Sequence, residues 1–360
     1  MKRSLFILKI AVAGYLLVLG SGCTSNYPIE PIIALENSNY QIGDTTYLEL
    51  TPPIMGFNNP TALFIGKDNL LYVADTKNNR ILMMDVSGRL LGARHVLQPI
   101  SITQDFRLDL LVGCCIVQPN GDTVGVIIRI HLYNAMHILE QAVVDTVWKE
   151  TAQPERRIVG ISTMPNNSYL VARNGPDNRS IIDPDTRVMR FSAADKYITP
   201  VTDLVTTTNG TGINYINQLT GISTIPNSSN FIVLQKSVGV GYGAIMMSFS
   251  SSSDFEGWQP TYDPSNPKDA AVDLVHKEWF VYPTGVAIDN NRLDVFICDA
   301  AQDSVFRFNS RGRFRKESFG FYKTGRRMKY PTGVAIFDKI LYVADGQANC
   351  IFRFKLSTDF

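Results

Sequence analysis

Six residues stand at equivalent places in this 360-residue chain where side chains could do chemistry. Each closes an apolar run and precedes a polar loop, and together they are Asp75, Cys114, Arg173, Gln235, Asp299 and Asp345. An Asp at such a place often accepts hydrogen bonds from backbone N–H groups of the turn that follows. We therefore expect the three Asp residues to cap turns. The replacements at Arg173 and Gln235 point instead to a binding role.

The loops that follow these replacements are long and contain Gly, Asn and Pro. They read RNGPDNRSIIDPDTR over 173–187 and QKSVGVGYGA over 235–244, after CCIVQPNGDTVG over 114–125. Long loops held on a rigid scaffold often carry function. The side chains expected to hydrogen-bond or stack on a sugar or a peptide are Arg173, Asn178, Arg179, Gln235 and Tyr242. Loop drift without a binding role is the alternative.

A repeated phrase identifies the elements that must position these loops. It reads PTALFIGKDNLLYVADTKNNRILMMD from Pro60, PTGVAIDNNRLDVFICDAAQDSVFRF from Pro283 and PTGVAIFDKILYVADGQANCIFRF from Pro331. Each copy contains three apolar runs separated by polar turns, and weaker copies begin near 100, 158 and 219. Self-similarity at a fixed period indicates stacked supersecondary units that cannot bury their apolar faces alone.

Six copies of short strands with Gly, Asn and Asp turns predict an all-β fold, a six-bladed β-propeller of four-stranded blades over residues 46–360. The last copy ends in a third strand at Phe354, so we expect Tyr47–Leu50 to supply the fourth strand and close the ring. The innermost strands should surround a central channel, with Thr61, Thr284 and Thr332 at their beginnings on the face that carries the long loops.

The phrase PTGVAI…LYVAD…IFRF resembles the NHL repeat, whose propellers usually have six blades. The likeness covers about residues 46–357; it is close in blades one, five and six, and limited to hydrophobic pattern in blades two to four. It implies that the face with the beginnings of the innermost strands binds ligands. It also suggests two enzyme classes: amidating lyases that hold zinc with inner-strand histidines, and lactonase-type propellers that bind a divalent cation through acidic and Asn side chains.

The residues of this chain do not match either of these metal sites. The four histidines, His95, His131, His137 and His276, lie outside the innermost strands, so a three-histidine zinc site is not expected. The innermost strands contain no carboxylate, and no Ser-His-Asp arrangement or phosphate loop is evident. We therefore assign no catalytic residue, no metal ligand and no cofactor.

The N-terminus is typical of an export signal. Lys2 and Arg3 precede the apolar stretch Leu5–Leu19, and Gly20-Ser21-Gly22 leads to Cys23. This arrangement resembles the lipobox of bacterial lipoproteins, although Leu is commoner at the position of Gly20. The resemblance implies a signal peptide over 1–22, diacylation of Cys23 and a membrane anchor. An ordinary signal peptide with an incidental Cys is the alternative. The polar, proline-bearing residues 23–45 read as a tether.

Four cysteines remain after Cys23, and export would permit disulfides. Cys114 and Cys115 are neighbours, which leaves either a vicinal bridge or two small buried side chains at a strand end. Cys298 and Cys350 fall in adjacent repeats and could pair, but spacing alone does not establish it.

Two further features carry open alternatives. Basic residues crowd the outer part of the fifth copy: Arg307, Arg311, Arg313, Arg315, Lys316, Lys323, Arg326, Arg327 and Lys329. They suit contact with anionic glycans or lipid headgroups, or simply form a solvated outer strand. Trp258, between copies four and five, either stacks on sugars or fills a gap between blades.

Taken together, these observations predict a lipid-anchored, exported propeller in the cell envelope, as an outer-membrane lipoprotein facing periplasm or exterior. It would be a binding or scaffold module whose partner is a glycan, a peptide or an envelope protein. A formal net charge of +1 gives no global field for nucleic acid, and none is expected as a partner. The alternatives are an NHL-type lyase or hydrolase with a degenerate site, and a purely structural subunit.

Overall fold

The computed structural model describes residues 45–207, 212–236, 241–252, 256–261, 273–276, 279–320 and 328–360. The expected signal peptide, Cys23 and nearly all of the tether lie outside these residues, as do Lys323, Arg326 and Arg327. Thr45–Phe360 form one compact unit.

Blades 1 to 3 follow one another along the chain, and each contains four antiparallel strands in sequence order. From the innermost to the outermost, the strands of blade 1 are β3 (Pro60–Ile65), β4 (Leu71–Asp75), β5 (Arg80–Met84) and β6 (Leu90–His95). Those of blade 2 are β7 (Ser101–Gln104), β8 (Leu110–Val117), β9 (Thr123–His131) and β10 (Val143–Lys149). Those of blade 3 are β11 (Arg157–Thr163), β12 (Tyr169–Asn174), β13 (Arg187–Phe191) and β14 (Tyr197–Pro200).

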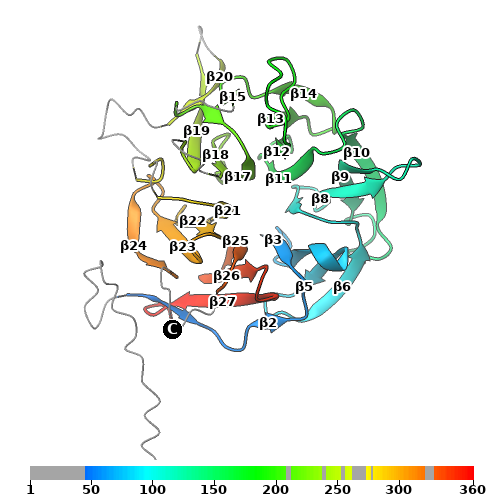
Figure 1. The fold of residues 1–360 in the computed structure, drawn as a ribbon. Coiled ribbons are helices and arrows are strands. Elements are labelled where there is room, and N and C mark those ends of the chain that lie inside the picture. The colour runs from blue at the N-terminus through cyan, green and yellow to red at the C-terminus, as the bar shows by residue number, and fades with distance from the viewer. Residues whose placement is uncertain are drawn as a thin grey trace, which may run out of the picture. The chain divides into compact units, whose positions relative to one another are not determined.

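Blades 4 and 5 have the same order, and blade 6 takes its fourth strand from the N-terminal end of the ring. The strands of blade 4 are β17 (Leu219–Thr224), β18 (Phe231–Gln235), β19 (Ala244–Ser251) and β20 (Glu256–Pro260). Those of blade 5 are β21 (Pro283–Ile288), β22 (Val295–Asp299), β23 (Ser304–Phe308) and β24 (Phe314–Phe319). Those of blade 6 are β25 (Pro331–Phe337), β26 (Ile340–Asp345), β27 (Cys350–Leu356) and β1 (Tyr47–Glu49). Figure 1 shows the six sheets arranged radially around one axis. The predicted six-bladed β-propeller is confirmed.

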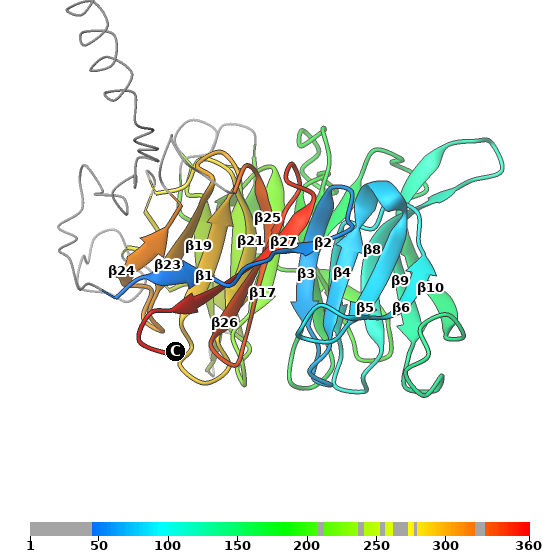
Figure 2. The same cartoon turned by 90° about the horizontal axis from the view of Figure 1, so that it is seen from below.

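The ring closes where the sequence predicts. β1 pairs antiparallel with β27, with Tyr47 opposite Leu356 and Glu49 opposite Phe354, and β2 (Ile54–Met55) pairs with the same strand (Figure 2). The Tyr47 ring lies 5.2 Å from that of Phe319, centroid to centroid, so this strand also packs on blade 5. Pairing both ends of the chain in one sheet removes an exposed strand edge.

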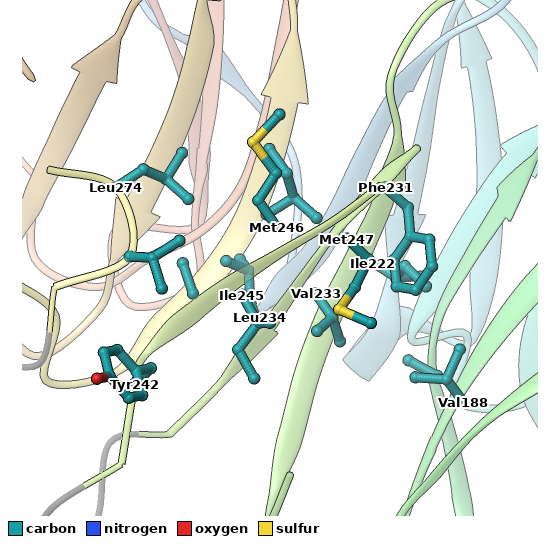
Figure 3. Close-up of a cluster of buried hydrophobic side chains, with 14 of the residues drawn as sticks. Val188, Ile222, Phe231, Val233, Leu234, Tyr242, Ile245, Met246, Met247 and Leu274 are labelled. Atoms are coloured by element: carbon teal, nitrogen blue, oxygen red, sulfur yellow. The ribbon is translucent and has the colours of Figure 1, made fainter. Parts of the chain in front are cut away.

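The apolar core lies between neighbouring blades. Every residue of β4, β18 and β22 is buried, because a second strand has a blade on each side. Figure 3 shows one such cluster, in which Phe231, Val233 and Ile245 of blade 4 point into packed apolar surroundings. Such burial contributes roughly 25 cal/mol per Å² of apolar surface removed from water.

The innermost strands approach one another closely around the axis. A Cβ atom on Gly285 of β21 would lie 2.8 Å from the Cα of Gly333 in β25, which explains the glycine in the repeated PTG phrase. Three short elements were not predicted from the sequence: the 3-10 helix η1 (Thr76–Asn78), and the parallel strands β15 (Val205–Thr206) and β16 (Tyr215–Ile216) between blades 3 and 4. Among the described residues, no helix has the length and apolar character to span a bilayer.

Candidate functional site

The innermost strands enclose a channel of about 960 Å³ along the axis of the ring. In Figure 1, β3, β11, β17, β21 and β25 stand around its centre. The walls are mostly Leu, Ile, Val, Ala and Gly with interspersed Ser and Thr. Pockets that combine apolar walls with a few polar groups are the usual form of ligand sites, so the channel is the candidate site.

The three Asp residues that close second strands join two loops at the same end of each blade. Asp299 accepts hydrogen bonds from the N–H groups of Ala301 and Gln302 in the following turn, and also from Val281 and Tyr282 ahead of β21. The predicted turn cap is thus confirmed at Asp299, and the backbone contacts to the preceding loop were not foreseen.

Asp345 repeats this arrangement, and Asp75 departs from it. Asp345 accepts from the N–H groups of Gln347 and Ala348 and from that of Tyr330. The prediction for Asp75 was wrong, because its carboxylate caps no backbone N–H of η1. It accepts instead from the Asn58 N–H and from the side chains of Asn78 and Arg80, and blades 5 and 6 have no arginine at the position of Arg80.

Gln235 replaces the Asp in blade 4. Its side-chain amide joins the same two loops, through both its oxygen and its nitrogen. Its Oε1 accepts from the Asn217 N–H at 2.7 Å, while Nε2 donates to the carbonyl oxygens of Tyr242 at 2.8 Å and Tyr215 at 3.1 Å. The side chain is buried, and these bonds join the two loops of the blade. Gln235 therefore has a structural role.

Arg173 replaces the Asp in blade 3 and reverses its charge. The buried guanidinium donates to Glu150 at 3.2 Å, to Asp183 at 2.8 Å and to the backbone carbonyls of Pro184 and Asp185. Arg156 binds the same acidic groups from the other side, with Nη1 2.7 Å from Asp183 and Nε 2.7 Å from Asp185. This buried network holds the long loop after β12 against the blade.

The other three predicted ligand-binding residues lie on the same loops. Asn178 is buried and donates to the Asn217 side chain at 2.8 Å, so it links blade 3 to the connection before blade 4. Arg179 is exposed and forms a bidentate pair with Asp177. Tyr242 is buried in the core cluster of blade 4. Four of the five predicted residues are thus buried in the scaffold, and their ligand-binding role stays a prediction.

The side chains that reach the channel mouth follow these positions by one residue. Asn174 follows Arg173 and Lys236 follows Gln235, and both line the channel. Tyr282 and Tyr330, which precede β21 and β25, line it beside them, with ring centroids 6.3 Å apart in an edge-to-face arrangement. The Lys236 ammonium lies 5.4 Å from the centroid of the Tyr282 ring. These residues form what we call the Lys236 mouth.

Sequence reasoning missed this mouth although a signal was present. The phrase YPTGVAI occurs twice, at Tyr282 and at Tyr330, but the repeat was read from its Pro onward. The Thr residues that follow do line the channel, yet their hydroxyls are engaged. Thr284 donates to the carbonyl of Pro331 and Thr61 to that of Pro99, each in the next blade.

The described residues contain no group of three or more His, Cys, Asp or Glu side chains placed to hold a metal ion. His131 lies at the end of a third strand between Asp109 and Asp145, and its nitrogens are 3.2 and 2.8 Å from their carboxylate oxygens. None of the four histidines belongs to an innermost strand, as predicted.

Cys114, Cys115, Cys298 and Cys350 are all buried free thiols, so neither the vicinal bridge nor the pairing between repeats is present. Burial, with Cys115 next to it, raises the pKa of Cys114 to about 12. Such thiols are protonated at neutral pH and therefore unreactive.

Burial decides one of the two remaining alternatives, the role of Trp258. Trp258 is buried against Phe231 and Phe249 and donates to the Ser229 carbonyl, so it fills a gap and does not offer a stacking surface. In the basic part of blade 5, Arg307 is buried and paired with Asp294 at 2.6 Å, whereas Arg311, Arg315 and Lys316 are exposed. Contact of this surface with anionic glycans or lipid headgroups stays a prediction.

This arrangement defines the chain as a six-bladed β-propeller. It is similar to solved structures of a luciferin-regenerating enzyme (10% identity, TM-score 0.59, covering 87% of this chain and 95% of that one), a gluconolactonase from Xanthomonas campestris (12%, 0.55, 88% and 91%) and an auxiliary nutrient binding protein from Bacteroides thetaiotaomicron (12%, 0.56, 84% and 70%). At such identities the likeness concerns the fold alone. No protein-family model and no curated protein sequence matches this chain.

Proposed function

We propose that this propeller is a binding module that holds a glycan at the Lys236 mouth of its channel. The observation that carries the proposal is the pair of tyrosines from adjacent blades, Tyr282 and Tyr330, exposed to the channel beside Lys236. Aromatic rings offer flat apolar surfaces to the C–H faces of sugars, and phenol, amide and ammonium groups pair with their hydroxyls.

Neutral polar groups complete this mouth. Asn174, Gln218 and Asn59 come from blades 3, 4 and 1 and line the same end of the channel. Their amides both donate and accept, as sugar hydroxyls do. Similar propellers include an auxiliary nutrient binding protein, so a binding role lies within the repertoire of the fold.

The test is titration of the purified full-length chain in detergent with a panel of oligosaccharides, followed by calorimetry. We expect Tyr282→Ala and Tyr330→Ala each to weaken binding about tenfold, equivalent to 1.4 kcal/mol. Tyr197→Ala is the matched control, because this tyrosine lies on the outer strand β14. Failure of every oligosaccharide to bind, or equal affinities for all three variants, would contradict the proposal. Hydrolysis or elimination products in the recovered ligand would support the lyase or hydrolase alternative.

We also propose that the protein is exported and held at a membrane of the cell envelope through acyl chains on Cys23. The support is the order of basic, apolar and small residues before that cysteine. Each buried methylene adds roughly 0.8 kcal/mol, so two or three chains suffice for stable anchoring. Cys23→Ala should move the protein from the membrane to the soluble fraction. Unchanged membrane association of this variant would exclude the anchor.

A further inference from the structure

The charges along the channel are of one sign. Of the described residues that line it, the charged ones are Lys67 and Lys236, and no Asp or Glu is among them. The chain as a whole has 33 acidic and 34 basic residues, so this local imbalance is not a consequence of composition. A cleft with one sign of charge and low-dielectric walls focuses the field and attracts the opposite charge.

The two lysines lie in different surroundings. The Lys67 ammonium donates to the Gln104 carbonyl at 3.0 Å and lies 4.2 Å from the centroid of the Phe106 ring. Asp68 and Asp105 are close enough to act on its charge. The positive charge at the Lys67 end of the channel is therefore partly offset by these two carboxylates.

Lys236 has no such compensation. Within the described residues, no ion pair joins it to a carboxylate, and its side chain is exposed at the mouth beside the Tyr282 ring. Its backbone N–H donates to the Gln218 carbonyl at 3.1 Å, which fixes the position of its Cα at the channel rim.

Among the described residues, the side chains that line the channel beside Lys236 are neutral. Burial, and then the nearby Tyr282, raise the pKa of Tyr330, so this phenol remains a protonated hydrogen-bond donor well above neutral pH. A lysine held among neutral donors and aromatic rings is suited to one anionic group of a ligand, because the ammonium and the phenols all donate to it.

We propose that the ligand of the Lys236 mouth is an acidic glycan, in which a sugar-ring carboxylate pairs with the Lys236 ammonium while Tyr282 and Tyr330 contact the sugar faces. This inference rests on the proposed function, since it specifies the class of glycan bound at the same site. The ammonium selects the charge, and the two tyrosines bind the sugar rings whether or not a carboxylate is present.

The experiment compares each acidic oligosaccharide with its own uncharged form. Trimers of galacturonate, glucuronate and mannuronate, and the methyl esters of the same trimers, are titrated into the full-length chain in detergent. We expect at least one acid to bind about tenfold or more tightly than its ester, a difference of roughly 1.4 kcal/mol. The preference should shrink at high salt, because ionic strength screens an exposed charge pair.

Three variants separate the role of Lys236 from a general effect of charge. Lys236→Gln should abolish the preference for the acid over its ester, and Lys236→Arg should keep most of that preference. Lys67→Gln is the matched control, because it removes the same charge from the opposite mouth and should leave the preference intact.

The failures of the two proposals are distinguishable. If acid and ester bind equally, or Lys236→Gln keeps the preference, this inference is overturned, while a loss of affinity in Tyr282→Ala would still support glycan binding. If no trimer in either form binds and no neutral oligosaccharide does so, the proposed function itself fails.

Discussion

The hydroxyl of Thr332 donates to the carbonyl oxygen of Pro60 at 2.5 Å and joins the last blade to the first across 272 residues. Thr220 donates to Pro283 at 2.6 Å and Thr284 to Pro331 at 2.8 Å in the same manner. The second residue of these three innermost strands is therefore a junction, in which the Thr hydroxyl binds the first residue of the next innermost strand.

Replacing Thr332 by Val should lower the free energy of unfolding by about 1 kcal/mol, because the hydrogen bond is lost and the shape of the side chain is kept. Urea denaturation measures this change. Thr199→Val is the control, since that exposed hydroxyl bonds only the adjacent Pro200 carbonyl. Equal stability of Thr332→Val and the unmodified chain would show that the junction contributes nothing.

Deletion of residues 46–52, which include β1, should lower the free energy of unfolding by roughly 3–5 kcal/mol. It removes the partner strand of β27 with its backbone hydrogen bonds and the aromatic contacts of the half-buried Tyr47, which together amount to about that much. Leu48→Ala should have little effect, because this side chain is 42% exposed. Thermal unfolding that is unchanged after the deletion would refute closure by the N-terminal strand.

Arg173→Ala should lower stability by about 3 kcal/mol, because it removes one of the two arginines that pair with the buried Glu150. It also removes the buried donor to the Pro184 carbonyl. Arg179→Ala should leave stability unchanged, because its pair with Asp177 is exposed to solvent. Guanidinium denaturation of both variants compares two arginines of one loop. A mild effect at Arg173 would argue against the buried network. Reduced glycan affinity in Arg179→Ala would support its predicted role as a ligand contact.

Acid should destabilise the fold in part through Asp195. Burial acts to raise the pKa of this carboxyl, but hydrogen bonds and the charge of the buried Arg129 outweigh it and the pKa is lowered. The ionised form is thus favoured by folding. The contribution is fully present above the unfolded pKa of about 3.9 and is lost as the pH falls through the lower folded value.

Urea denaturation between pH 7 and pH 3 measures this dependence. Asp195→Asn should be less stable than the unmodified chain at pH 7, and the two should converge towards pH 3. Asp122→Asn, in the exposed tip of a hairpin, should follow the unmodified chain throughout. Parallel curves for Asp195→Asn and the unmodified chain would show that this carboxyl does not contribute to the acid limb.

The sequence predicted the strands of the propeller well, but it did not predict which side chains line the channel. Three Pro-Thr phrases and three weaker copies of the same hydrophobic pattern located all six innermost strands, because strand order and burial follow from a periodic hydrophobic pattern. The pattern also placed Tyr47 beside β27, since a ring with an unpaired third strand needs one more partner. The 3-10 helix after Asp75 and the β15–β16 pair escaped prediction because short elements in loops carry no such period.

What the sequence determined by itself is the number of blades, their boundaries and the way the ring closes. Only the tertiary structure decided which of two neighbouring side chains faces the channel. Gln235 and Lys236 point to opposite sides of one strand end, as do Arg173 and Asn174. Successive side chains of a strand alternate between its two faces, and the sequence alone does not tell which face is buried. The packing of each blade against its neighbours decides which residue of the pair is buried. The buried residue needs hydrogen-bond partners inside the protein, while its neighbour faces the channel axis.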